Sequence, residues 1–566
     1  MGKRVYRRIA AGLAALALAG CGGGGDDASP AACIVVNGTA GSTTFVPADP
    51  PVPLAQVSGA SPFAPGCGRE AICGTVYVGS EVEPFVSVNP LDATNLVGVW
   101  QQDRWSNGGA QGLLAAFSTD GGQTWAARQA PFSRCSGGNS VNGGDYARAT
   151  DPWVSFGADG SVYWMAMTIT DLPSGAEVSA MRVSRSTDGG DTWGAPITLI
   201  HDSNPYFNDK NAITADPTDP AYVYAVWDRL DFARTRGPAY FARTIDGGNT
   251  WEAARSIYDP GTEAQTVGNQ IVVLSDGTLL NLFTEIQYGT STTPDSAALR
   301  VIHSADHGTT WGAPVTVDSL LARGAYDPEN GAPIRDGSIL GAIAVGPDDA
   351  IWVARQDSSL DIVCIRFPCY GPRDAIALSR SLDGGQTWSA PVRVNSDPTV
   401  QAFTPAVRVA ADGTIGVTYY DLRDNTPDPA TLLASHWLAT STDGIDWTEQ
   451  LVTGPFDLAI APDALGLFLG DYTGLTSDGS NFLTFFAQTQ PDLADRTSIY
   501  ALPFPGPVVA AKSAGLSYQA VASQPVVPSG EWARLIGENI RRQRHTFPDH
   551  PGHPDHPGQL PGYLRR

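Results

Sequence analysis

The chain alternates short apolar runs with tight polar turns, and this pattern recurs along most of its length. The runs are rich in Val, Ile, Tyr, Phe and Trp, as in residues 223–227, and two runs flank each turn. Such patterns are typical of β-hairpins. The expected hairpin turns lie at residues 89–92, 159–160, 216–220, 276–277, 347–349, 412–413 and 477–479.

An eight-residue phrase, Ser-x-Asp-x-Gly-x-Thr-Trp, follows every expected hairpin except the last. Copies begin at Ser118, Ser186, Thr244, Ser304 and Ser381, and a shortened copy begins at Ser441. Their starts are 58 to 77 residues apart, which indicates a repeat architecture. Ser, Thr and Asp side chains can bond a turn backbone, and Gly permits positive φ. We therefore expect the phrase to be a folding device and not a catalytic one.

Each repeat should hold four strands: the hairpin strands A and B, strand C leading into the phrase, and strand D after it. This predicts an all-β fold, a β-propeller of four-stranded antiparallel blades. The seven expected hairpins favour seven blades. The repeated phrase occurs six times, so six blades is the alternative. With seven, an N-terminal strand should complete the last blade and protect its edge. Residues 75–78 and residues 33–36 are the candidates for that strand.

The repeated phrase is the Asp-box, and over residues 80–505 the chain resembles the sialidase superfamily and other Asp-box β-propellers. The resemblance implies the propeller fold. In sialidases a tyrosine nucleophile pairs with a glutamate, an aspartate serves as acid/base, and three arginines grip the substrate carboxylate. Active sialidases also carry an Arg-Ile-Pro phrase on the first inner strand. Here that strand, residues 83–88, has no arginine, and the nearest phrase, at residues 333–335, lies mid-chain in another order.

The N-terminus is predicted to be an export signal. A basic segment precedes an apolar run at residues 9–19, which is too short to span a bilayer. Residues 18–21 resemble a bacterial lipobox, which implies cleavage before Cys21 and lipidation of that residue. The expected domains are a lipoprotein signal peptide (1–21), a linker (22–65), the propeller (66–510) and a C-terminal extension with a disordered His/Pro-rich tail (511–566).

Net charge and cysteine content narrow the partners and the compartment. A net charge of −23 disfavours nucleic acid and anionic membranes, which need a basic face. Membrane contact is expected only through the lipid, on a monomeric protein at the periplasmic side or the cell surface.

Besides Cys21 there are six cysteines, an even number that indicates disulfides. Cys364–Cys369 is the predicted bridge. Cys67–Cys73 with Cys33–Cys135 is one further pairing among several.

Propeller topology places the candidate chemistry on one face. The A–B turns and Asp-boxes should share the bottom face, and the B–C and D–A loops the top face. Acids follow strand B at the same depth in four repeats: Asp228, Glu285, Asp357 and Asp421. The D–A loops add Asp151, Asp209, Lys210, Gln270, Asp471 and Tyr472. These side chains are expected to surround the central opening.

The sialidase resemblance implies roles for several of these residues. Tyr420 or Tyr419 would be the nucleophile, Glu285 its partner and Asp103 the acid/base, with Asp228 and Asp421 as further catalytic candidates. The candidate carboxylate clamp comprises Arg104, Arg229, Arg355 and Arg423. No cofactor is expected, and a Ca²⁺ site on loop oxygens is an alternative without assigned ligands. Local salt bridges around a wet channel would explain the same charges.

The sequence therefore predicts an exported, lipid-anchored, sialidase-like propeller whose B–C and D–A loops recognise an extracellular glycan. If the protein is an enzyme, it should be a glycoside hydrolase of the exo-sialidase type. The alternative is a non-catalytic propeller that binds a ligand or a protein.

Overall fold

The computed structural model describes residues 43–45, 54–68, 74–171, 177–361, 373–504, 528 and 530–544. Cys21, Cys33, Cys73, Cys364 and Cys369 lie outside these ranges, and so does the predicted Cys364–Cys369 bridge. Among the described residues, no helix is long and apolar enough to cross a membrane.

The described strands sort by pairing into seven consecutive antiparallel units. Their innermost strands are β3 (Val76–Asn89), β7 (Arg148–Phe156), β11 (Tyr206–Ala215), β16 (Ala264–Val273), β21 (Ala342–Val345), β25 (Ala402–Val409) and β30 (Gly474–Asp478). The second strands are β4 (Asp92–Trp105), β8 (Val162–Asp171), β12 (Val223–Asp231), β17 (Leu279–Gln287), β22 (Ile351–Asp357), β26 (Ile415–Asp421) and β31 (Asn481–Thr489). The third strands are β5 (Ala110–Ser118), β9 (Glu177–Ser186), β14 (Ala239–Thr244), β18 (Ser296–Ser304), β23 (Ala375–Ser381), β27 (Leu433–Ser441) and β32 (Thr497–Phe504). The outermost strands are β6 (Ala126–Arg128), β10 (Ile197–Ser203), β15 (Arg255–Tyr258), β19 (Val315–Ser319), β24 (Val392–Arg393), β28 (Trp447–Asp457) and β2 (Ala55–Gln56).

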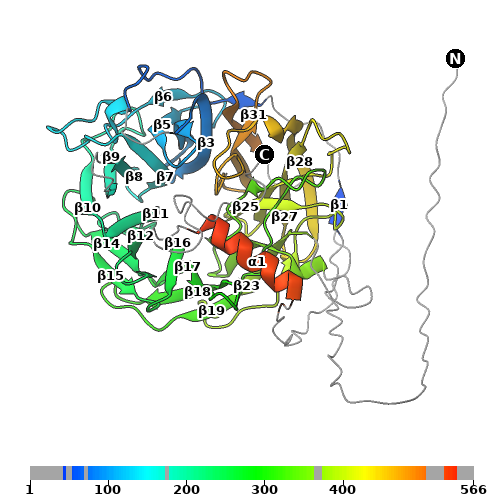
Figure 1. The fold of residues 1–566 in the computed structure, drawn as a ribbon. Helices are drawn as coiled ribbons and strands as arrows, with labels where there is room; N and C mark the ends of the chain where they lie inside the picture. The colour runs from blue at the N-terminus through cyan, green and yellow to red at the C-terminus, as the bar shows by residue number, and fades with distance from the viewer. Residues whose placement is uncertain are drawn as a thin grey trace, which may run out of the picture. The chain divides into compact units, whose positions relative to one another are not determined.

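The inner strands form a closed ring, because each contacts the next and β30 contacts β3 (Figure 1). This is the predicted β-propeller, with apolar side chains buried between neighbouring sheets. The last unit is completed by an N-terminal strand, as expected, but by β2, which pairs antiparallel with β32. The expected candidate at residues 75–78 instead begins β3 of the first unit.

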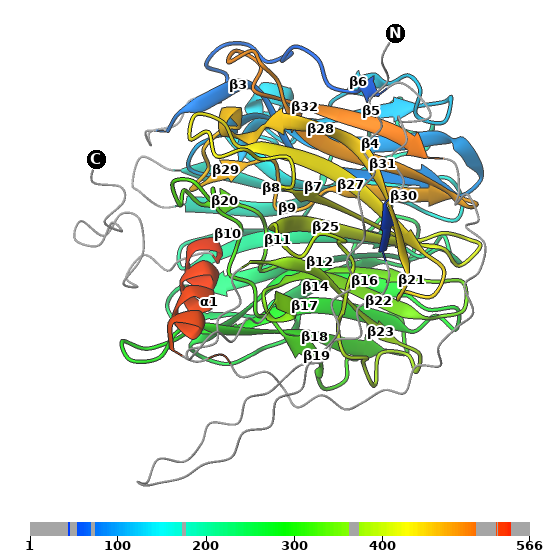
Figure 2. The ribbon, with the colours of Figure 1, turned by 90° about the vertical axis from the view of Figure 1, so that its right-hand side faces the viewer.

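Several shorter elements lie outside the four-stranded pattern. They are β1 (Thr43–Phe45), β13 (Arg236–Gly237), β20 (Ile334–Arg335), β29 (Leu467–Phe468), helix α1 (Gly530–Gln543) and 3₁₀ turns at Arg134–Ser136, Ser359–Asp361 and Leu458–Ile460. Strands β20 and β29 pair in parallel, and they come from the D–A loops before the fifth and seventh inner strands. Together with α1 they lie at one end of the ring's strands (Figure 2).

The Asp-boxes are turn devices, as predicted. In the first, Asp120 Oδ1 accepts from the Thr124 backbone N–H at 2.9 Å, and the Thr124 hydroxyl donates to Asp120 Oδ2 at 2.6 Å. The Trp125 ring lies 5.4 Å from Phe485 of the seventh unit, which ties neighbouring sheets together. The box also bonds the start of β4, next to the A–B turn, since Gly121 N–H donates to Thr94 O. Boxes and A–B turns therefore share the bottom face.

These turns should make the fold sensitive to acid. Hydrogen bonds from Thr250, Thr310 and Thr387 lower the pKa of the Asp-box carboxyls Asp246, Asp306 and Asp383 to about 2. Because these folded-state values lie below the unfolded value of about 3.9, the stability they contribute is present above about pH 4 and is lost as pH falls toward 2.

We expect the thermal unfolding midpoint to fall between pH 4 and pH 2. Scanning calorimetry across that range measures it. A variant with all three threonines replaced by valine should show a flatter acid dependence. An equally steep dependence in that variant would assign the acid sensitivity to other carboxyls.

Candidate functional site

The top end of the central channel is ringed by backbone bulges. The pairing of β3, β7, β11, β16 and β25 with its neighbour shifts register at the same level of each strand. The bulged residues have positive φ, and four of them are not glycine: Glu83 (53°), Asp151 (50°), Lys210 (47°) and Thr404 (51°). Such conformations cost about 1–3 kcal/mol each and concentrate at functional sites. The ring is therefore our candidate site.

Lys210 stands at the centre of this site. Its Nζ lies 2.5 Å from Asp471 Oδ2, 3.4 Å from Asp151 Oδ1 and 3.7 Å from Glu83 Oε1. The chain has three lysines, and Lys210 is the only one in the described residues. A compact ammonium with three donors suits three surrounding carboxyls better than a planar guanidinium would. We call these four residues, with Arg104, Asp209, Asp228 and Arg335, the mouth cluster.

Burial and neighbouring charges set the protonation of the mouth cluster. Burial raises the pKa of Glu83 to about 8, although Lys210 opposes this shift. Burial also raises the pKa of Asp209 to about 6. Burial favours a higher pKa for Asp471 too, yet the positive charges of Arg335 and Lys210 hold its pKa well below the usual range. At neutral pH the cluster therefore holds a protonated Glu83 close to an ionised Asp471.

Two arginines complete the cluster from different loops. Arg335, on β20, holds Asp471 with two bonds of 3.0 and 2.7 Å. Arg104, on β4, donates to Gln101 Oε1 at 2.8 Å. The guanidinium groups of both lie over the Phe468 ring of β29, at 4.7 and 4.8 Å from its centroid. Paired strands β20 and β29 thus bring an arginine and its aromatic support to the channel mouth.

Three aromatic rings line the channel just inside the mouth cluster. Phe85 and Trp153 stack at 3.7 Å, and Trp153 meets Tyr472 edge-on at 5.1 Å. The Tyr472 hydroxyl donates to Pro152 O at 3.1 Å. All three rings are partly exposed although they lie inside the ring of strands. The site therefore offers carboxyls and cations next to aromatic faces.

Part of the predicted site is brought together here. The D–A loop residues Asp151, Asp209, Lys210 and Asp471 meet at the channel mouth, and the predicted residues Asp228 and Arg104 join them. Asp228 pairs across strands with Asp209 and accepts from Asn269 Nδ2 at 2.5 Å. Its other oxygen has no hydrogen-bond partner among the described residues. Burial, then the charge of Asp209, raises the Asp228 pKa well above its usual value.

The structure places the other predicted arginines away from the mouth cluster, each bound to carboxylates of its own. Arg229 meets Asp202 at 2.7 and 2.8 Å. Arg355 is fully buried and bonds Asp318 and Asp357. Arg423 bonds Asp421 at 2.6 Å and Glu449 at 3.0 Å. These three arginines do not converge into a clamp, because each is paired with carboxylates of its own or the preceding unit: Arg229 with Asp202 of the second unit, Arg355 with Asp318 of the fourth and Asp357 of the fifth, and Arg423 with acids of the sixth.

The predicted nucleophile and its partner are also apart from the mouth. Tyr420 is buried between the sixth and seventh units, where its hydroxyl donates to Ala487 O at 2.9 Å. Tyr419 is buried and donates to Glu449. Glu285 bonds Arg300 at 3.1 Å and accepts from Tyr258. These side chains pack and pair locally and do not face the opening.

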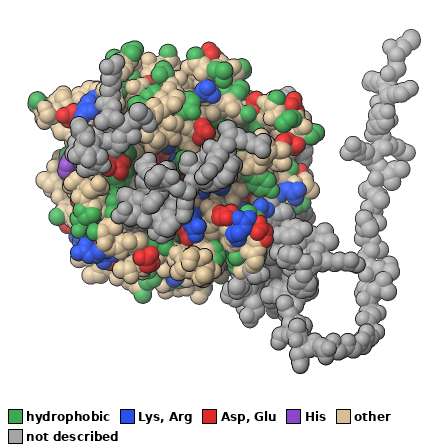
Figure 3. Space-filling view, viewed as in Figure 1, with side chains coloured by type: hydrophobic (Ala, Val, Ile, Leu, Met, Phe, Trp, Pro, Cys, Tyr) green, Lys and Arg blue, Asp and Glu red, His purple; other side chains and the backbone are tan. Residues whose placement is uncertain are grey.

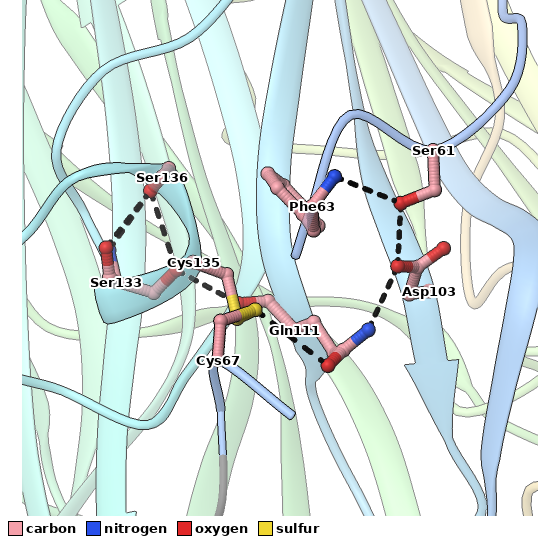
Figure 4. Close-up of a disulfide and its surroundings, with 8 residues drawn as sticks. All are labelled: Ser61, Phe63, Cys67, Asp103, Gln111, Ser133, Cys135 and Ser136. Carbon is pink, nitrogen blue, oxygen red and sulfur yellow. Dashed lines mark hydrogen bonds between the residues drawn. A yellow bond between two sulfur atoms is a disulfide. The ribbon is translucent and has the colours of Figure 1, made fainter. Parts of the chain in front are cut away.

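Asp103, the predicted acid/base, anchors the N-terminal segment (Figure 4). Its carboxylate accepts from Ser61 Oγ at 2.6 Å, from Gly79 N–H at 2.9 Å and from Gln111 Nε2 at 2.8 Å. Beside it lies a disulfide between Cys67 and Cys135. The pairings of Cys67 with Cys73 and of Cys33 with Cys135 were therefore wrong. Folding brings the segment around Cys67 against the loop after the first Asp-box.

Two features of the top face escaped the sequence analysis. One is Glu83, which a sequence signal marks: Glu83-Pro84 and Asp151-Pro152 repeat an acid–proline pair in successive units. Helix α1 lies within the segment expected to be an extension with a disordered tail. Its buried Trp532, Ile536 and Ile540 recur every four residues, which is a helical pattern.

Helix α1 docks on the loops of the fourth and fifth units. Asn539 Nδ2 donates to Ala322 O at 3.1 Å, and Arg544, the residue after the helix, bonds Asp295 at 2.9 Å. Its last residue, Gln543, donates to Asp336 next to the ring of bulges. The face on which α1 lies shows acidic and basic side chains interspersed and not gathered by sign (Figure 3).

Among the described residues, no group of three His, Cys, Asp or Glu side chains is arranged to hold a metal ion.

Fold and site together define a β-propeller with a buried charge cluster at its channel mouth. No protein family model matches the chain, and no curated protein matches it. Solved structures similar to it include a protein of unknown function from Dyadobacter fermentans, 14% identical, covering 77% of this chain and 99% of that one, with a TM-score of 0.40. An α-L-arabinanase of Penicillium chrysogenum is 13% identical, with 63% and 94% covered and a TM-score of 0.39. A Hadza microbial sialidase is 16% identical, with 75% and 66% covered and a TM-score of 0.35.

Proposed function

We propose that this protein is a lipid-anchored, extracytoplasmic β-propeller that binds a glycan at the mouth cluster and hydrolyses it. Glu83 would donate the proton to the leaving oxygen, and Asp151 would serve as the opposing carboxylate. The observation that carries this proposal is their shared geometry. Both sit on strained bulges of adjacent inner strands, and both lie within 4 Å of one ammonium group.

The protonation of Glu83 fits glycoside hydrolysis. Glycosidases pair a carboxylic acid that keeps its proton with a carboxylate that acts as base or nucleophile. Burial gives Glu83 a pKa of about 8, so that it carries a proton at neutral pH. Asp151 contacts Lys210 through one oxygen at 3.4 Å and lines the channel. Lys210 would position both carboxyls.

The charges favour a neutral glycan over sialic acid. Binding a substrate carboxylate requires cations that are free to meet it. Arg335 is held by Asp471, and three of the four predicted clamp arginines are held elsewhere. Arg104, the fourth, is buried and donates to Gln101. The carboxylates and aromatic faces of the site suit the hydroxyls and the apolar faces of a neutral sugar. Arg335 and Lys210, 22% and 12% exposed, would meet the substrate first.

The extracytoplasmic location rests on the chain's own residues. The lipobox-like segment ending in Cys21 would provide the anchor. The Cys67–Cys135 disulfide fits an oxidising compartment.

A panel of fluorogenic glycosides, neutral pyranosides and furanosides with one sialoside, tests the activity on the full-length protein in detergent. We expect turnover of a neutral glycoside and its loss in Glu83→Gln and Asp151→Asn. Glu285→Gln and Tyr420→Phe are matched controls, because both residues lie away from the mouth cluster, and they should retain activity. Loss in the controls with full activity in Glu83→Gln would overturn the assignment.

A second function, binding without catalysis, is favoured by how fully the cluster is paired. Asp151, Asp471 and Glu83 all contact Lys210, so the cluster can be stable with no substrate present. Folded protein that turns over no glycoside but binds a neutral oligosaccharide on a glycan array, and loses that binding in Asp151→Asn, would establish this second function.

A further inference from the structure

The central channel is a cavity of about 710 Å³, separate in its lower part from the mouth cluster. Inner-strand residues of all seven units line it, from Asp151, Lys210 and Asp471 at the top to Asn89, Ser275 and Gly479 at the bottom turns. Its size is within the range of small-molecule sites.

The top of the channel is barred by charge pairs. Lys210 of the third unit bonds Asp471, which precedes the seventh inner strand, so that their contact crosses the ring. Arg335 holds Asp471 from the loop before the fifth unit. A ligand of the lower channel would therefore enter between the A–B turns of the bottom face.

Arg408 is the unusual residue in this cavity. It lies on β25, lines the channel and is exposed. Its Nε donates to Ser477 Oγ at 3.3 Å, and among the described residues no carboxylate lies within ion-pairing distance of it. Although the side chain has open surface in the channel, the surrounding ring of strands partly removes it from water and so lowers its pKa, and no nearby acid opposes that shift. By contrast Arg229, Arg335, Arg355 and Arg423 are all bonded to carboxylates.

Hydroxyl groups share the channel wall with this cation. Ser87 Oγ accepts from Phe156 N–H at 3.2 Å, and Ser155 Oγ accepts from Ala215 N–H at 3.0 Å. Within the described ranges neither hydroxyl donates to another group, so both can donate to a ligand. Trp153 lies two residues beyond the bulge of its strand, and Arg408 lies four residues beyond the bulge of its own strand. Arg408 is therefore about 7 Å further down the channel than Trp153. A cation and hydroxyl donors thus face an aromatic end wall.

We propose that the lower channel is a second ligand site, entered from the A–B turn face, which binds a small organic carboxylate. The carboxylate would meet Arg408 in a two-bond contact, and its flat apolar part would lie toward Phe85, Trp153 and Tyr472. The site does not depend on glycan hydrolysis at the mouth cluster. An uncompensated guanidinium in a protein of net charge −23 selects an anion locally where the overall field repels one.

Calorimetric titration of the full-length protein with benzoate tests the proposal, with benzyl alcohol as the neutral probe of the same shape. We expect benzoate to bind at least tenfold more tightly than benzyl alcohol. Arg408→Gln should raise the benzoate Kd at least tenfold, and Arg408→Lys should raise it several-fold. Arg534→Gln removes the same charge from the exposed face of helix α1 and should leave the Kd unchanged.

Equal binding of the two probes, or benzoate binding that survives Arg408→Gln, would overturn the proposal. If Arg408→Gln does not fold, Arg408→Lys decides, since an unchanged Kd there would exclude a two-bond guanidinium contact.

Discussion

Replacing Lys210 with methionine should destabilise the protein by about 3–5 kcal/mol, because it leaves buried carboxyls without their shared cation. The side chains of Glu83, Asp151 and Asp471 are 1%, 4% and 6% exposed, so water cannot replace the ammonium. Methionine keeps the length and apolar stem of lysine and removes only the charge and its donors. Urea unfolding of the variant and of the wild type at pH 7.5 measures the loss.

Two further variants separate charge from packing. Lys210→Arg keeps the charge but presents a planar fork in place of three tetrahedral donors, and we expect it to restore only part of the stability. Asp151→Asn combined with Lys210→Met should recover part of the loss, because one uncompensated charge is gone. The destabilisation should also shrink as pH falls toward 5, since protonated carboxyls need no counterion.

Arg534→Gln, on the exposed face of α1, is the matched control and should cost at most about 1 kcal/mol. A loss below 1 kcal/mol for Lys210→Met would show that the carboxyls are already neutral or hydrated.

The fold follows from local patterns that sequence displays directly. The Asp-box fixes its own turn through bonds that span four residues, such as Ser118 and Thr124 to Asp120, and it needs no distant partner. Gly, Asp and Pro residues mark the hairpin turns in the sequence. Because hairpin turns and Asp-boxes recur regularly, the sequence predicts that they share one face of the ring. It also predicts correctly that Asp151, Lys210 and Asp471 lie on the opposite face.

The site could be predicted only in part, because side-chain direction depends on features that spacing does not reveal. Along a regular strand, direction alternates with every residue, and one bulge reverses the alternation beyond it. Glu83 and Asp151 face the mouth because their strands bulge there. Arg229, Arg355 and Arg423 lie at or just beyond the end of strand B, yet each pairs with a carboxylate of its own or the preceding unit and does not reach the opening. Position in the chain gave their depth in the blade but not their partners.

Distant pairings were beyond reach for a related reason. Cys67 and Cys135 are 68 residues apart, and no spacing rule favours that pair over the others. Arg335 lies in a phrase in the wrong place for a sialidase. It reaches the channel mouth only because β20 pairs with β29, 133 residues further along the chain. Such contacts are products of ring closure and are not encoded in any local segment.

Replacing Glu83 with glutamine should lower kcat/KM for an unactivated glycoside by about 10²–10⁴-fold, the usual contribution of a general acid. Glutamine keeps the shape of glutamic acid but has no proton to give. With a dinitrophenyl glycoside, whose leaving group needs no protonation, the same variant should lose far less. This contrast separates proton donation from a structural effect, which would slow both substrates alike.

The pH profile gives an independent test of the same assignment. Burial holds the Glu83 pKa at about 8, and the reaction requires its protonated form, so wild-type kcat/KM should fall as pH rises through about 8. Glu83→Gln should lack that alkaline limb, because glutamine does not titrate. Glu285→Gln should keep it, since Glu285 is bound to Arg300 away from the mouth. If the limb persists unchanged in Glu83→Gln, the proton donor is another group, and Asp228, whose pKa burial also raises, becomes the next residue to replace.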